Sequence, residues 1–226
     1  MLYITGDCHG ELSKFKTSSA RKLKKDDTLI VCGDFGFVWD GSKTETDNLN
    51  WLSKRKYNIA FVEGAHENFE MLAKYPIVDY MGGKARQIAN NIYQLIRGDI
   101  FEIEGKKIFA FGGGDDEERE VTDIHESPLF QRLPTEAECE KARDNLEKAG
   151  HEVDYIISYD SGFAVRRFLE MESNCFNNLH AFLHEVSQNN KYGKWYFGCF
   201  HLDKRIPPAY YCVYKNIYNA ETGKEI

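Results

Sequence analysis

The sequence has no long hydrophobic run and no excess of basic charge. No apolar stretch approaches the roughly 20 residues needed to cross a membrane, and the N-terminus lacks a basic segment followed by an apolar one. We therefore expect no membrane partner and a cytoplasmic location. Its 29 basic and 36 acidic side chains give a net charge of −7. This acidic balance argues against a general nucleic-acid-binding surface.

The chain also lacks the cysteine spacing of a structural zinc site. Such sites use cysteine pairs separated by roughly two to four residues, and none of the six cysteines has a partner at that spacing. We expect these cysteines to be free thiols in a reducing compartment. Internal repeats and low-complexity linkers are missing as well. Residues 1–226 are therefore expected to form a single domain that is large enough for a substantial core.

What is present is a recurring pattern of apolar strands that end in polar, glycine-containing turns. Parallel strands deliver their carboxyl ends to one edge of a sheet, where open α/β folds place their ligands. Glycine permits tight turns, and Asp and His are ligands for divalent metals. The pattern therefore predicts a metal site at that edge. The strand ends and their polar residues are 2–5 with Asp7 and His9, 29–32 with Asp34, 59–62 with His66, and 195–197 with His201.

The order of the segments predicts an α/β fold with mixed sheets. Three strands alternate with helices expected at 11–23, 47–56 and 69–74, which favours a parallel sheet with right-handed crossovers. Residues 86–111 form four short strands, and a hairpin turn at Glu104-Gly105 indicates antiparallel pairing. A helix at 135–148 begins with a capping box, in which Thr135 precedes Glu138. Strands at 155–158, 194–199 and 210–214 and a helix at 178–188 complete the chain.

The order of the motifs resembles the calcineurin-like metallophosphoesterases. The resemblance rests on Gly6-Asp7-Cys8-His9-Gly10, Gly33-Asp34, Gly64-Ala65-His66-Glu67, Ser158-Tyr159 and Gly198-Cys199-Phe200-His201. The segments Phe35–Asp40 and Phe111–Gly113 look like one bacterial branch of that family. The resemblance implies two mixed β-sheets packed face to face with flanking helices, an αββα sandwich.

The same resemblance implies a metal centre with a complete first site and an incomplete second site. The family binds two divalent metals, and the ligands of the first would be Asp7, His9, Asp34 and His201, all of which are present. Asp34 would also bridge to the second metal. The three other ligand positions of that second metal hold Ala65, Tyr159 and Cys199 in this chain. His66 occupies the position of the family's general acid.

Three interpretations follow from this ligand set. In the first, the protein is a phosphatase or phosphodiesterase with one divalent metal per chain (Mn, Zn or Fe), which acts on a phosphorylated small molecule or a nucleotide. In the second, Tyr159 and Cys199 rebuild the second site with a different metal preference. In the third, the fold is catalytically inactive and serves as a binding or regulatory module, since fold alone does not settle activity. The sequence leaves any protein partner open.

Overall fold

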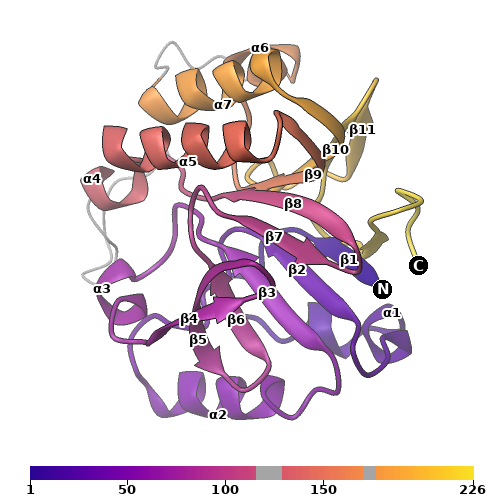
Figure 1. Cartoon of the computed structure of the whole chain (residues 1–226). Helices are drawn as coiled ribbons and strands as arrows, with labels where there is room; N and C mark the ends of the chain where they lie inside the picture. The colour runs from indigo at the N-terminus through magenta and orange to yellow at the C-terminus, as the bar shows by residue number, and fades with distance from the viewer. Residues whose placement is uncertain (116–128, 170–176) are drawn as a thin grey trace.

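Two β-sheets pack face to face in the computed structural model of the chain, and helices cover both outer faces (Figure 1). The structure describes residues 1–115, 129–169 and 177–226. Five of the six cysteines are free thiols, as expected, and Cys175 lies outside the described residues. Within the described residues, no helix has the length and apolar character needed to cross a bilayer.

The first sheet contains seven strands in the described part of the chain. Its central strands run parallel and in sequence order, as the alternation of strands and helices predicts. Antiparallel neighbours extend the sheet at both edges. In spatial order the strands are β13 (Tyr218–Asn219), β1 (Leu2–Thr5), β2 (Thr28–Cys32), β3 (Asn58–Val62), β6 (Ile92–Leu95), β5 (Gly83–Ala89) and β4 (Ile77–Tyr80).

The second sheet has six strands among the described residues. Its first two strands form the hairpin that the sequence predicts, because Glu104 and Gly105 both have a positive φ, at 55° and 68°. The four central strands are parallel. In spatial order the strands are β11 (Lys204–Ile206), β12 (Tyr210–Cys212), β10 (Lys191–Phe197), β9 (Glu152–Ser158), β8 (Lys106–Phe111) and β7 (Ile100–Ile103).

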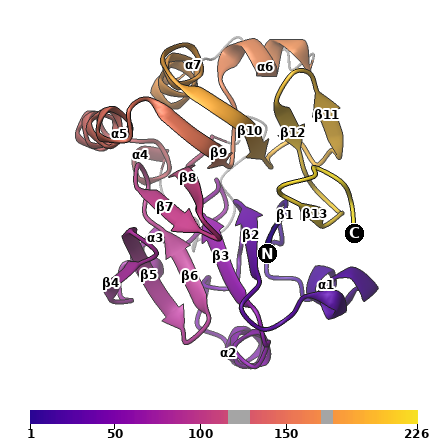
Figure 2. The same cartoon turned by 45° about the vertical axis from the view of Figure 1, so that its right-hand side comes forward.

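The core lies between the sheets because alternate side chains of a strand point to opposite faces. In β1, Ile4 joins the core between the sheets, whereas Tyr3 packs on the outer side. Both views show α5 and α7 over the second sheet and α2 under the first (Figure 1 and Figure 2). The predicted αββα sandwich is therefore confirmed. The helices are η1 (Lys14–Lys16), α1 (Ser18–Lys22), α2 (Lys43–Leu52), α3 (Phe69–Leu72), α4 (Leu129–Arg132), α5 (Glu136–Lys148), α6 (Phe163–Phe168) and α7 (Asn178–Asn189).

Side-chain caps mark the starts of α1, α2 and α5. The capping box of Thr135 and Glu138 is confirmed at the start of α5. The helix expected at 11–23 is instead broken, because Thr17 is extended and its side chain accepts the N–H of Ala20 to start α1. Similarly, Ser42 accepts the N–H of Glu45, so α2 begins four residues before the predicted start. Short caps thus outweighed the hydrophobic periodicity on which those two predictions rested.

Four short elements have no clear signal in the sequence: β4, β11, α4 and α6. Among them, α6 is attached to the core by a buried charged group. The carboxylate of Asp160, just after β9, accepts a hydrogen bond from Arg166 of α6 at 2.6 Å and lies 2.9 Å from His180 Nε2 of α7. Burial alone would raise the pKa of Asp160, but the contact with His180 and the charge of Arg166 outweigh it and lower that pKa.

We expect Asp160→Asn to lower the free energy of unfolding at neutral pH by about 3–5 kcal/mol, because it removes the negative charge from a buried ion pair between Asp160 and Arg166. The lowered pKa of folded Asp160 also has a consequence for acid stability. Its contribution is present above the unfolded pKa of about 3.9 and is lost as the pH falls through the folded value.

Urea denaturation from pH 7 to pH 2 measures both effects. The variant should show a weaker decline of stability in acid than the wild type. Asp144→Asn, a change at an exposed carboxylate of α5, should leave stability within about 0.5 kcal/mol. An equal acid decline in the wild type and in Asp160→Asn would contradict the role of this carboxylate.

Candidate functional site

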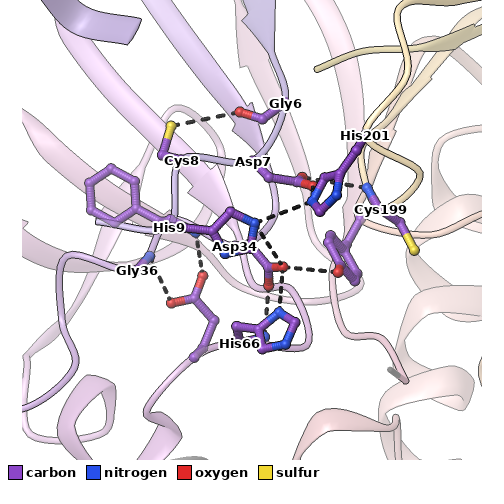
Figure 3. A network of polar contacts seen from close by, with 12 residues as sticks. Gly6, Asp7, Cys8, His9, Asp34, Gly36, His66, Cys199 and His201 are labelled. Atoms are coloured by element: carbon purple, nitrogen blue, oxygen red, sulfur yellow. Dashed lines mark hydrogen bonds and ion pairs between the residues drawn. The ribbon is translucent and has the colours of Figure 1, made fainter. Parts of the chain in front are cut away.

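The polar strand ends of both sheets meet at one edge of the sandwich. Asp7 and His9 follow β1, Asp34 follows β2 and His66 follows the neighbouring parallel strand β3. From the second sheet, His201 follows β10 and comes to the same place (Figure 3). The structure therefore brings together all five residues that the sequence placed at strand ends.

Three of these residues form one compact group of potential metal ligands. His9 Nε2 lies 3.3 Å from His201 Nε2, and His201 Nε2 lies 3.2 Å from Asp7 Oδ2. One ligand atom from each of the three falls within 4.8 Å of the other two. Two imidazole nitrogens that face each other at this distance need a shared proton or cation between them, since two lone pairs repel.

Asp34 belongs to a second, overlapping group with His9 and His66. Its Oδ1 accepts the backbone N–H of His66 at 2.7 Å, and its Oδ2 lies 2.8 Å from His66 Nδ1 and 3.9 Å from His9 Nε2. The ligand atoms of these three residues also fall within 4.8 Å of one another. His9 is thus common to both groups, and Asp34 is turned toward His66 rather than toward Asp7.

The electrostatics of the two carboxylates differ. Burial raises the pKa of Asp7, against the effect of its contact with His201. Burial would raise the pKa of Asp34 too, but its contacts with His66 outweigh this and lower that pKa. The contact with Asp7 also raises the pKa of the His201 imidazole.

The backbone around the cluster is held in an uncommon conformation. His9, Asp34, Cys199 and His201 all have a positive φ, between 44° and 66°, a region that non-glycine residues seldom adopt. Such residues persist only where the surrounding structure holds them, and they concentrate at functional sites. Gly64 supplies necessary space, since a Cβ there would lie 2.1 Å from Asp34 Oδ1.

A divalent cation fits these residues. Asp7 Oδ2 is buried and has no hydrogen-bond partner among the described residues, although His201 Nε2 lies 3.2 Å from it. A buried carboxylate oxygen without a donor is costly unless a cation compensates it. Carboxylate oxygens and imidazole nitrogens together suit borderline ions such as Zn²⁺, Mn²⁺ and Fe²⁺.

Tyr159 reaches the cluster from the end of β9 and contacts Asp34. Its hydroxyl donates to Asp34 Oδ2 at 2.9 Å, and the side chain is buried. Gly33 and Gly114 make room for the ring, because a Cβ at either position would lie within 2.4 Å of a ring carbon. Burial, followed by the charge of Asp34, raises the pKa of Tyr159 well above 10, so the phenol keeps its proton.

Ala65 and Cys199 direct no ligand atom at the cluster. Ala65 is fully buried and its side chain has no ligand atom. Cys199 uses its backbone N–H, which lies 3.4 Å from Asp7 Oδ1, while its sulfur points away from Asp34 (Figure 3). Burial raises the pKa of the Cys199 thiol well above 9, which disfavours the thiolate needed for metal binding.

Two residues that the sequence analysis did not assign support the loops of the cluster. Glu67 is fully buried, and its carboxylate accepts the N–H of Phe35 at 2.7 Å, directly after Asp34. The ammonium of Lys14 donates hydrogen bonds to the carbonyl oxygens of Gly6 and Asp7. Glu67 lies within the Gly64–Glu67 motif, whereas no sequence signal marks Lys14.

Comparison with known proteins decides the family. A sequence profile described as calcineurin-like phosphoesterase matches residues 2–175, which is more than half of the chain. The chain belongs to the calcineurin-like phosphoesterase family. The resemblance seen in the motifs is thereby confirmed, although Cys199 and His201 lie beyond the matched residues.

Other comparisons are more distant. A search of curated proteins found no match. Among solved structures, the chain is similar to a Staphylococcus aureus protein assigned as a 5′-nucleotidase and solved in complex with alpha-ketoglutarate. The two are 15% identical with a TM-score of 0.46, and the match covers 96% of this chain and 49% of the other. This member of the family therefore spans about half the length of that protein.

We expect Tyr159→Phe to lower the free energy of unfolding by about 1.5–3 kcal/mol, because it removes a hydrogen bond to a buried, charged carboxylate. Tyr57→Phe is a matched control, since the buried Tyr57 hydroxyl has no hydrogen-bond partner among the described residues. That change should leave stability equal or higher. Chemical denaturation of the metal-free proteins measures both, and equal effects of the two changes would contradict the contact with Asp34.

Proposed function

We propose that this family member is a metal-dependent phosphoester hydrolase, a phosphatase or phosphodiesterase, with one divalent cation per chain. The cation would be Mn²⁺, Zn²⁺ or Fe²⁺, and its ligands would be Asp7, His9, Asp34 and His201. The observation that carries this proposal is the convergence of Asp7, His9 and His201 around a buried Asp7 oxygen that lacks a hydrogen bond. Asp34 would complete the set from its position 3.9 Å from His9 Nε2.

The side chains of the cluster would supply the proton and the positioning that hydrolysis needs. The chemistry supplied by a bound divalent cation is Lewis acidity, which offsets charge on phosphoryl oxygens and makes water more acidic. We assign His66 as the general acid that protonates the leaving oxygen. Asp34 holds the ring of His66 in one orientation through Nδ1, and the backbone N–H of His66 fixes the position of Asp34 in return. Positioning of this kind is the main contribution of the protein to phosphoryl transfer.

Tyr159 favours one cation over two. In the two-metal relatives that the motifs resemble, Asp34 would bridge both ions. Here its Oδ2 instead accepts the Tyr159 hydroxyl at 2.9 Å. Ala65 offers no ligand, and the thiol of Cys199 is turned away. We infer that a neutral phenol takes the place of a second positive charge next to Asp34.

A second candidate is a non-catalytic binding or regulatory module. It is favoured by the same contact, because both oxygens of Asp34 already accept hydrogen bonds from protein groups. The two candidates predict different behaviour with metal and substrate, so a single set of variants separates them.

For the hydrolase, we expect native mass spectrometry to find about one divalent ion per chain, and none in Asp7→Ala. His66→Ala should retain the ion and lose about 10²- to 10⁴-fold in kcat toward aryl phosphate mono- or diesters, because it removes the proton donor and leaves the four proposed ligands in place. Asp144→Ala, at an exposed carboxylate of α5, serves as the control with unchanged metal content and activity. Metal binding without hydrolysis above the Asp7→Ala background would favour the binding module.

The one-cation assignment has its own test. The triple variant Ala65→Asn, Tyr159→His and Cys199→His restores ligand side chains at the three positions. We expect it to bind a second ion per chain, measured by native mass spectrometry with Zn²⁺ or Mn²⁺. A stoichiometry that stays at one in a folded triple variant would show that these positions do not surround a second site.

A further inference from the structure

The side chain of His201, which follows β10 of the second sheet, is 52% exposed. Its Nε2 faces Asp7 and His9, so these two contacts involve only the atom that would bind the cation (Figure 3). A metal-binding histidine is usually held by a hydrogen bond to its other ring nitrogen. In the part of the chain that the structure describes, no group makes that bond to Nδ1 of His201. The direction of this exposed ring therefore depends on a contact of another kind.

The ring of Tyr214 packs against the His201 imidazole. The two ring centres lie 4.7 Å apart, and the ring planes are tilted by 35°. Aromatic pairs at this separation attract each other beyond the effect of their buried area. Tyr214 is half-buried, and the other ring contact of His201 among the described residues is with His9, which is itself a proposed ligand. Tyr214 is thus the neighbour outside the ligand set that limits rotation of the His201 ring.

The backbone of Tyr214 is tied to the loop that carries His201. Asp203, in that loop, accepts the N–H of Tyr214 at 2.9 Å and the N–H of Lys215 at 3.0 Å. The hydroxyl of Tyr218 donates to the same carboxylate at 3.1 Å. One carboxylate therefore joins the loop after β10 to the segment after β12, so the ring of Tyr214 is presented to His201 from a fixed backbone.

Tyr214 also lies against the loop that carries Asp7. Gly6 packs so closely on this segment that a Cβ there would lie 2.8 Å from Tyr214 Cα. The ammonium of Lys14, which donates to the carbonyl oxygens of Gly6 and Asp7, lies 5.4 Å from the centre of the Tyr214 ring. A cation at this distance from a ring face is attracted to it. Tyr214 therefore contacts the ligand loops of both sheets.

We propose that Tyr214 is a positioning residue of the metal centre. Its ring holds the His201 imidazole in the orientation in which Nε2 faces Asp7 and His9, in place of a hydrogen bond to Nδ1. The inference rests on the proposed metal-dependent function, and it concerns the affinity and geometry of the cation site. Phenylalanine at this position would keep the ring contact, whereas an aliphatic side chain would remove it.

Competition for Zn²⁺ with a chromophoric chelator measures the effect on affinity. We expect Tyr214→Leu to weaken Zn²⁺ binding about 3- to 10-fold, because it removes one aromatic contact, and Tyr214→Phe to retain the wild-type affinity. Tyr192→Leu is the matched control, since Tyr192 is also half-buried and its ring contacts Trp195 and Tyr210. Tyr192 lies at the start of β10, at the opposite end of that strand from His201, so its loss should leave the affinity unchanged.

The visible spectrum of the Co²⁺-substituted protein reports the geometry of the ligands. We expect the spectrum of Tyr214→Phe to match that of the wild type, and the spectrum of Tyr214→Leu to differ from it. A loss of stability alone would not change the spectrum of the folded, metal-loaded protein. Equal Zn²⁺ affinities and Co²⁺ spectra for Tyr214→Leu and the wild type would overturn the positioning role and leave the hydrolase in place. Equal losses in Tyr214→Phe and Tyr214→Leu would also overturn it, because the ring would not be the cause.

A measurement on the metal-free protein separates this proposal from the hydrolase assignment. The ring centres of His9 and His201 lie 5.5 Å apart, and the nuclear Overhauser effect between their ring protons reports the orientation of His201 without any cation. We expect Tyr214→Phe to keep this signal and Tyr214→Leu to weaken it. That pattern in a protein that binds no divalent ion would support the role of Tyr214 and overturn the metal-dependent hydrolase. An unchanged signal in Tyr214→Leu would overturn the role of Tyr214.

Discussion

The structure of the site depends on one buried residue, Asp34, which connects four strand ends. Its backbone carbonyl accepts the N–H groups of Cys8 and His9, which lie beyond β1. Its carboxylate accepts hydrogen bonds from His66 beyond β3 and Tyr159 beyond β9. A buried carboxylate is stable only when donors or cations surround it. The contacts of Asp34 therefore fix the positions of the loops of both sheets relative to one another.

The contacts of Asp34 explain why the backbone of the cluster keeps an uncommon conformation. Asp34 and His9 adopt a positive φ, which costs free energy that only well-paired surroundings can offset. Glu67 contributes by accepting the N–H of the residue after Asp34, although burial and the nearby charge of Asp34 raise its own pKa well above the ordinary value. Two buried carboxyl groups thus support one loop.

Tyr159 supplies Asp34 with a neutral hydrogen-bond donor. A phenol hydroxyl donates to Asp34 at 2.9 Å, and Gly33 and Gly114 leave space for the ring. The donor satisfies the carboxylate but brings no positive charge, so the electrostatic field at the cluster differs from that of a two-metal site.

The motifs of the sequence predicted the family, the sandwich fold and the residues that meet at the site. Each of these motifs follows directly after a strand. It therefore puts a polar residue at the carboxyl edge of a sheet, however the side chains of the core pack. Local signals also predicted the hairpin at Glu104-Gly105 and the capping box at Thr135, since both depend only on neighbouring residues.

The grouping of the site residues depends on contacts between distant parts of the chain. The side chain of Asp34 could have faced Asp7 or His66, and contacts from distant strands turn it toward His66 and Tyr159. The same holds for Lys14, which reaches the carbonyl of Asp7, and for Tyr214, whose ring packs against His201. These contacts join segments that are far apart along the chain or loops without periodic structure, so no local pattern encodes them.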